Sequence, residues 1–246
     1  MKIVTGHQPA FLPWVGLLHK VMIADVFIFM DVAKFRKRAF MHRNKIQIND
    51  SPHFIGLKLN QESDKQYCHE VSISNSHENN LEEIYNKIIF TYQKYKYFKD
   101  LDLFLVKSFD NSKYYLNDIC IAQLNTLCDI MDIKTQIIKE SSIIDFEITK
   151  RISASERLLM HATKTSAKIY ITGINSKDYL DASIFKSKKI FHRVQNFNYT
   201  PFLKQQICLE PLSLIHQIAQ LGFQQLKNEL LVNQVNKAQL LEELND

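Results

Sequence analysis

Short apolar runs alternate with segments of helical periodicity from the start of the chain. Residues 2–6 form an apolar run that ends in Gly6, and residues 25–30 form a second run rich in β-branched and aromatic side chains. Both patterns predict buried strands. Between them, apolar residues from Trp14 to Ile23 recur at helical spacing. This strand–loop–helix–strand unit predicts two parallel, neighbouring strands in one sheet.

The rest of the chain adds elements of both kinds. Residues 44–48 and 53–59 alternate around a polar turn at 49–52, which predicts a β-hairpin. Periodicity predicts further helices at about 80–95, 97–109, 115–131, 153–165 and 211–222, and further strands at 70–73, 134–139, 167–172 and 189–194. Pro211 is predicted to begin the last of these helices, and Gly222 is predicted to end it.

These elements predict an α/β fold, with a mostly parallel sheet of Rossmann-like type flanked by helices and carrying a β-hairpin and helical insertion. We expect residues 1–223 to form a single domain. Residues 224–246 are expected to form an amphipathic C-terminal helix, either packed on the domain or used for association, for example in a homodimer. An exposed stripe of Leu230, Leu231 and Leu240 would favour association.

Composition narrows the classes of partner. The net charge is +5, and the basic residues are spread along the chain, which favours a phosphate-bearing small molecule over nucleic acid. The four cysteines show no CxxC pairing, so free thiols in a reducing compartment are expected. The apolar stretch 11–30 is interrupted by Pro13, His19, Lys20 and Asp25, which argues against a membrane span. With no signal peptide evident, we expect a cytoplasmic protein.

Polar residues gather where the first two predicted strands end. In parallel sheets, ligands bind beyond the carboxyl ends of the strands. His7 follows the first strand and is suited to acid–base chemistry near neutral pH, although it would serve equally well as a helix cap. Gln8 can donate and accept hydrogen bonds to a ligand. Asp31 ends the second strand and is a candidate base.

Several cations follow Asp31 within twelve residues. One carboxylate beside Lys34, Arg43 and their neighbours suits Mg²⁺ with a bound phosphate. The alternative is a solvated loop with ordinary surface pairing, which is preferred for Lys37 and Arg38. Asn44 is expected to point inward with Arg43. Trp14 is a candidate for stacking on a substrate ring, with core packing as the alternative.

Two later segments add candidates for substrate binding. Glu156 and Arg157 begin a predicted helix, where Glu156 would also favour the helix N-terminus through the dipole. Lys177 and Asp178 follow the strand at 167–172, where a plain strand-to-helix turn is the alternative. The sequence has no Cys/His metal spacing, P-loop, GxGxxG or GxSxG motif. Structural zinc, P-loop kinases, Rossmann dehydrogenases and serine hydrolases are therefore disfavoured, and no protein-held metal site is predicted.

Rare residue types at fixed offsets resemble the opening of the WbqC-like family. They are His7-Gln8-Pro9, Leu12-Pro13-Trp14, Gly16, Asp25, Asp31 and Arg43-Asn44. The likeness continues through Ser155-Glu156-Arg157-Leu158 and residues 170–173 and 178–180, and it spans about 2–223. The chain departs from the family pattern at His42, where Asn is usual, and at His216, where an acidic residue is usual. The first elements also resemble the HxGH-type nucleotidyltransferase and pantoate-ligase fold, but the second His is missing.

The resemblance implies a role in bacterial surface polysaccharide, notably O-antigen. Combined with the cations and the acid–base candidates, it predicts an enzyme that transfers an acyl or aminoacyl group to a nucleotide-linked amino sugar. The predicted catalytic residues are His7, Asp31 and Arg43, and the predicted substrate-binding residues are Gln8, Trp14, Lys34, Asn44, Glu156, Arg157, Lys177 and Asp178. Mg²⁺ or ATP are the cofactors left open. The alternatives are a non-catalytic scaffold of a polysaccharide assembly complex, an ATP-using adenylyl-transfer ligase, a glycosyltransferase and, least favoured, an RNA-binding protein.

Overall fold

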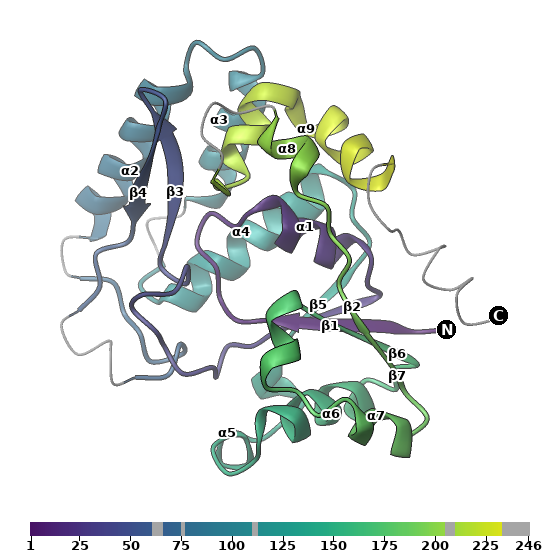
Figure 1. Ribbon diagram of the computed structural model, residues 1–246. Coiled ribbons are helices and arrows are strands. Elements are labelled where there is room, and N and C mark those ends of the chain that lie inside the picture. The colour runs from purple at the N-terminus through teal and green to yellow at the C-terminus, as the bar shows by residue number, and fades with distance from the viewer. Residues whose placement is uncertain (61–65, 75–76, 110–112, 205–209, 233–246) are drawn as a thin grey trace.

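A five-stranded parallel sheet forms the centre of the molecule (Figure 1). The computed structural model describes residues 1–60, 66–74, 77–109, 113–204 and 210–232. The strands are β1 (Ile3–His7), β2 (Val26–Phe29), β5 (Gln136–Lys139), β6 (Ile169–Thr172) and β7 (Phe191–Val194), in the order β5-β2-β1-β6-β7. Every pairing is parallel. The predicted fold class and the predicted pairing of the first two strands are confirmed.

Helices cover both faces of the sheet because successive side chains of each strand point to opposite faces. Phe27 and Phe29 pack in one core with α1 (Val15–Met22), α4 (Leu116–Ile130) and α9 (Ile215–Val232). Val26 and Ile28 pack in the other core with α6 (Ala154–Lys164) and α7 (Ser183–Ser187). In Figure 1, α6 and α7 lie below the sheet, and α1, α4 and α9 lie above it.

The connection from β2 to β5 contains the predicted hairpin and helical insertion. The hairpin strands are β3 (Arg43–Ile48) and β4 (Ser51–Gly56), followed by α2 (His77–Tyr92), α3 (Phe98–Ser108) and α4. The turn is shorter than predicted, because Asn49 and Asp50 alone form it, with φ of 46° and 62°. Two residues with positive φ suit a tight hairpin turn, and Asn and Asp tolerate that conformation. Ser51 and Pro52 therefore belong to β4.

Short elements complete the chain. They are the 3-10 helices η2 (Glu140–Ser142) and η3 (Ile174–Asp178) and the helices α5 (Phe146–Thr149) and α8 (Thr200–Leu203). The strand predicted at 70–73 is wrong, because this segment makes only the isolated bridges Leu59↔Ile73 and Ser72↔Tyr115. Its backbone is bound instead by the start of α4, where the Leu116 N–H donates to the Val71 carbonyl at 3.0 Å.

The C-terminal helix α9 also differs from the prediction. It begins at Ile215 and not at Pro211, and a second helical stretch follows Gly222 directly. Gly222 has φ 71° and ψ 168°, a non-helical conformation that kinks the chain between the two helical stretches. Leu230 is buried and Leu231 is exposed, while Leu240 lies outside the described residues. The predicted division at residue 223 falls within α9. No helix of the described residues is long and apolar enough to cross a membrane.

Candidate functional site

The sheet reverses its strand order between β1 and β6. From β1, the chain adds β2 and then β5 on one side, and β6 and then β7 on the other. Pairing of β1 with β2 continues to His7↔Phe29, whereas pairing of β1 with β6 ends at Thr5↔Ile171. The place where β1 and β6 diverge is a topological switch point, at which open α/β sheets bind their ligands. We call this place the switch point.

His7 is the last residue of β1 and lies at the switch point. Its Nδ1 is 2.7 Å from the carbonyl oxygen of Gln8. Because a carbonyl only accepts, Nδ1 carries the proton, and Nε2 keeps its lone pair. Burial and the charge of Lys20 lower the pKa of His7 to about 4, so the imidazole is neutral at pH 7. The ring meets Trp14, the N-cap of α1, edge-on with centroids 5.2 Å apart.

Lys20 is a charged residue of the switch point that the sequence did not single out. It lies in the last turn of α1, and 4% of its surface is exposed. Its Nζ donates to the carbonyl of Gly6 at 2.7 Å, which is its one hydrogen bond within the described part of the chain. Burial lowers the pKa of Lys20 to about 7. Buried lysines shift in this way because desolvation disfavours the charged form.

A buried ion pair lies on the α6 side of the sheet. Glu140 directly follows β5, and its side chain has no exposed surface. Its two carboxylate oxygens accept hydrogen bonds from Nε and Nη2 of Arg157. His161 Nε2 is 2.7 Å from Glu140 Oε1 and therefore donates to it. Burial would raise the pKa of Glu140, but the hydrogen bonds from Arg157 and His161 outweigh it and lower that pKa.

Tyr170 on β6 extends this chain of contacts. Its hydroxyl is 2.9 Å from His161 Nδ1. With Nε2 protonated toward Glu140, neutral His161 accepts this hydrogen bond, and Tyr170 donates it. Burial lowers the pKa of His161 and raises the pKa of Tyr170, so both are neutral at pH 7. Hydrogen bonds therefore join Tyr170 to His161, His161 to Glu140 and Glu140 to Arg157, as is usual for buried polar groups.

Gly6 joins this buried chain to the switch point. A Cβ at Gly6 would lie 3.3 Å from the Tyr170 hydroxyl and 3.2 Å from the Ile28 carbonyl oxygen. The carbonyl of Gly6 meanwhile holds Lys20. The positive charge of Lys20 contributes to the lowered pKa of His161 as well as that of His7. The two groups of residues therefore influence each other across the central strand.

Asp31, the predicted base at the end of β2, is engaged by Ser141. Its Oδ1 accepts from the Ser141 backbone N–H at 3.0 Å, and its Oδ2 accepts from the Ser141 hydroxyl at 2.5 Å. Asn117 of α4 donates to the Asp31 carbonyl at 2.9 Å. These contacts fasten the end of β2 to the start of η2, beside Glu140. Both carboxylate oxygens of Asp31 are therefore already engaged by Ser141.

Asn44 and Arg43 lie on β3 and have different surroundings. The buried Asn44 side chain donates to the Leu12 carbonyl at 2.6 Å and accepts from the Lys45 N–H at 2.8 Å. The Leu12 N–H in turn donates to Gln123 of α4 at 2.8 Å. Asn44 thus anchors the loop that carries Gln8. The Arg43 guanidinium instead lies 4.3 Å from the ring centre of Phe54 on the hairpin.

Three other predicted residues lie on segments that follow strands of the sheet, Lys34 after β2 and Lys177 and Asp178 after β6. Lys34 is exposed, and its backbone bridges to Tyr67. Lys177 and Asp178 are exposed in η3, directly after β6. Burial raises the pKa of Tyr179, the residue after η3, and the charge of Arg36 in the basic segment opposes this rise, so the two segments lie within electrostatic reach of each other.

Glu156 has a structural partner. It forms a capping box with Ser153 at the start of α6, and its side chain is exposed. Its neighbour Arg157 points to Glu140 instead. Sequence analysis did not identify Lys20, Glu140, His161 and Tyr170 as site residues. The available signal was the spacing of Arg157 and His161, which are four residues apart and therefore lie on one face of α6.

Metal ligands and thiols do not define the site. No group of three or more His, Cys, Asp or Glu residues that could hold a metal occurs within the described ranges. Cys68, Cys120 and Cys128 are free and buried, and Cys208 falls outside the described residues.

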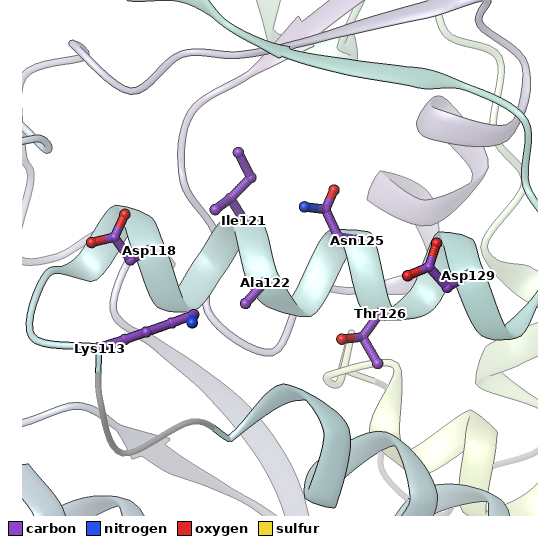
Figure 2. Close-up of a pocket in the computed structure, with 7 residues that line it drawn as sticks. All are labelled: Lys113, Asp118, Ile121, Ala122, Asn125, Thr126 and Asp129. Atoms are coloured by element: carbon purple, nitrogen blue, oxygen red, sulfur yellow. The ribbon is translucent and has the colours of Figure 1, made fainter.

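A separate hollow of about 530 Å³ lies along α4 (Figure 2). Its lining residues are Lys113, Asp118, Ile121, Ala122, Asn125, Thr126 and Asp129. None of them belongs to the switch point, and in Figure 2 their side chains spread along the helix rather than converge on one place. The hollow is therefore separate from the candidate site at the end of β1.

Comparison with known proteins places the chain in a family. The model of the WbqC-like protein family matches residues 8–227. The chain is 23% identical over 206 residues to "Uncharacterized protein Rv1507c" of Mycobacterium tuberculosis (strain ATCC 25618 / H37Rv), a match that covers 81% of this chain and 83% of that protein. No solved structure matches. Because the family match extends from the residue after β1 through the other four strands of the sheet, the insertion and most of α9, the chain belongs to the WbqC-like protein family.

Proposed function

We propose that the chain is a transferase that moves an acyl or aminoacyl group onto the amine of a nucleotide-linked sugar, in the making of a bacterial surface polysaccharide. The resemblance described from the sequence supplies the polysaccharide context. The observation that carries the proposal is the state of His7: a neutral imidazole at the switch point, with Nδ1–H held by Gln8 and Nε2 left as an acceptor.

His7 is the base in this proposal. The sugar amine attacks the carbonyl carbon of the acyl donor, and a C–N bond forms. Nε2 of His7 accepts a proton from the attacking nitrogen, and the bond to the leaving group then breaks, with the proton returned to the leaving group. A positioned general base contributes roughly 10²–10⁴-fold to a rate, most when its pKa lies near the working pH, so the lowered pKa of His7 favours the lower end of that range. Asp31 holds the neighbouring strand ends through Ser141.

Residues on the segments that follow β1, β2 and β6 would bind the nucleotide. Trp14 packs against His7 and offers an aromatic face. Lys34 and Lys177 are exposed cations on two segments that approach each other, and they would hold the diphosphate, with Gln8 and Asp178 as polar contacts. Arg43 and Asn44 would act less directly, through the hairpin and the loop that they anchor.

A thermal-shift screen of nucleotides and nucleotide sugars, with and without Mg²⁺, tests the proposal. A ligand at a hundredfold its dissociation constant stabilises the folded state by about 2.7 kcal/mol. We expect a nucleotide sugar to stabilise the wild type, and His7→Ala to lose transfer activity while it keeps its fold. His53→Ala is the matched control, since His53 is exposed on the hairpin.

The screen also separates the alternatives. Stabilisation by ATP alone would favour an adenylyl-transfer ligase, for which a histidine at the end of the first strand is the supporting observation. Full transfer activity in His7→Ala would refute the role of His7. If no nucleotide or sugar stabilises the protein, the scaffold hypothesis becomes the better one, and a search for protein partners is the next experiment.

A further inference from the structure

Lys20 is a buried cation that the proposed transfer step does not use. An ammonium group has three N–H donors, and charged groups are almost never fully buried without partners. The Lys20 ammonium is used once, by the Gly6 carbonyl at 2.7 Å, among the residues that the structure describes. Two donor directions are therefore open to a ligand.

The position of this cation is that of a ligand site. Gly6 is the first residue of β1 beyond Thr5, where pairing with β6 stops. Its carbonyl, and the ammonium bound to it, consequently lie at the switch point. Gly6, His7 and Gln8 are each partly exposed, so a ligand can approach along the end of β1.

The groups around Lys20 provide no compensating negative charge. His7 of β1 and His161 of α6 are both acted on by its charge and are neutral at pH 7. Behind His161, the Glu140 carboxylate is neutralised by Arg157. Within the described ranges, no carboxylate forms an ion pair with Lys20. A bound anion would therefore supply the partner that the charged form of Lys20 lacks in this part of the chain.

We propose that Lys20 binds an oxyanion of the substrate, a phosphate or a carboxylate, at the switch point of the sheet. The proposal rests on the proposed function for the identity of that substrate, because both a nucleotide sugar and a carboxylate-bearing acyl donor supply such a group. An oxyanion would accept hydrogen bonds from the two Lys20 N–H groups that Gly6 does not use. Charge-assisted hydrogen bonds of this kind are strong where little water competes for them.

Binding of an oxyanion here carries a proton with it. Burial holds the pKa of Lys20 at about 7, so at pH 8 most of the free protein has a neutral amine. An oxyanion binds the ammonium form. At pH 8, close to one proton is therefore taken up for each anion bound, and the affinity falls about tenfold for each pH unit above 7.

Isothermal titration calorimetry with sulfate and with acetate tests this inference. Neither anion titrates at pH 8, and sulfate stands in for phosphate while acetate stands in for a carboxylate. Titrations in two buffers of different ionisation enthalpy, at constant ionic strength in chloride, give the number of protons taken up. Uptake with sulfate alone assigns a phosphate site, and uptake with acetate alone assigns a carboxylate site.

Three variants assign the effect to Lys20. We expect Lys20→Met to lose anion binding, and Lys20→Arg to bind without proton uptake because a guanidinium stays charged. Lys58→Met is the control, since Lys58 is exposed and pairs with Glu83. If Lys20→Met does not fold, the fall in wild-type affinity from pH 6 to pH 9 decides the matter.

The inference is overturned if neither anion binds, if Lys20→Met binds as the wild type does, or if wild-type affinity does not change with pH. These outcomes leave the role of His7 standing, because that role is measured separately by transfer activity in His7→Ala. Conversely, loss of the transferase hypothesis leaves the anion titrations unaffected.

Discussion

Replacing Lys20 with methionine removes a buried charge and keeps the length of the side chain. The ordinary lysine pKa of 10.5 is lowered to about 7 in the folded protein. The unfolded chain therefore holds the proton more tightly than the folded protein does. Burial of the charge therefore lowers the free energy of unfolding by its full amount below about pH 7. This loss of stability becomes smaller as the pH rises from 7 and disappears above about 10.5.

The magnitude follows from these two pKa values. At about 1.36 kcal/mol for each pH unit between 10.5 and about 7, the charge lowers the free energy of unfolding by about 5 kcal/mol at pH 6. At pH 9 the folded protein has already lost this proton while the unfolded chain still holds it, and the cost is about 2 kcal/mol. Methionine leaves the Gly6 carbonyl without its donor, which costs about 1–3 kcal/mol at every pH.

We therefore expect Lys20→Met to be more stable than the wild type by about 2–4 kcal/mol at pH 6, and about equal to it at pH 9. Urea unfolding followed by circular dichroism, in chloride buffers free of sulfate and phosphate, measures both differences. Lys58→Met should match the wild type within about 0.5 kcal/mol at each pH. A difference between Lys20→Met and the wild type that is the same at pH 6 and pH 9 would refute the reasoning.

Two further substitutions test the buried chain behind the switch point. Arg157→Met leaves Glu140 buried without its cation and should lower the free energy of unfolding by about 3–5 kcal/mol at pH 7, and by less at pH 4, where the carboxyl can take up a proton; Arg151→Met, at an exposed position, is the control. Gly6→Ala should cost about 1–3 kcal/mol, because the added methyl group meets the Tyr170 hydroxyl at 3.3 Å. Urea unfolding measures both, and a loss in Arg157→Met no larger than that in Arg151→Met would contradict the first.

Most of the fold could be predicted from the sequence because apolar periodicity is local. The strands at 2–6 and 25–30 lie within two residues of β1 and β2. The errors arose where tertiary contacts decide. Residues 70–73 have strand-like side chains but make isolated bridges, and the chain after Pro211 first crosses other segments, with Ser213 N–H bound to the Lys45 carbonyl, before α9 starts.

The candidate site divides in the same way. His7 and Gln8 could be found because the end of a first parallel strand is predictable and ligands bind there. Lys20 was visible only as a polar interruption of an apolar stretch, since its burial depends on how α1 packs on β1. Glu140, His161 and Tyr170 come from three separate elements, and only the folded sheet brings them together.

The loop between β1 and α1 is held by its neighbours at several points. Leu12 alone is bound through its N–H by Gln123 and through its carbonyl by Asn44. Fixing the backbone of one residue costs roughly 1–2 kcal/mol in conformational entropy. In this protein, folding has already met that cost for the segment beside His7. A substrate that binds here does not have to order the loop, so more of its contact energy is retained as affinity.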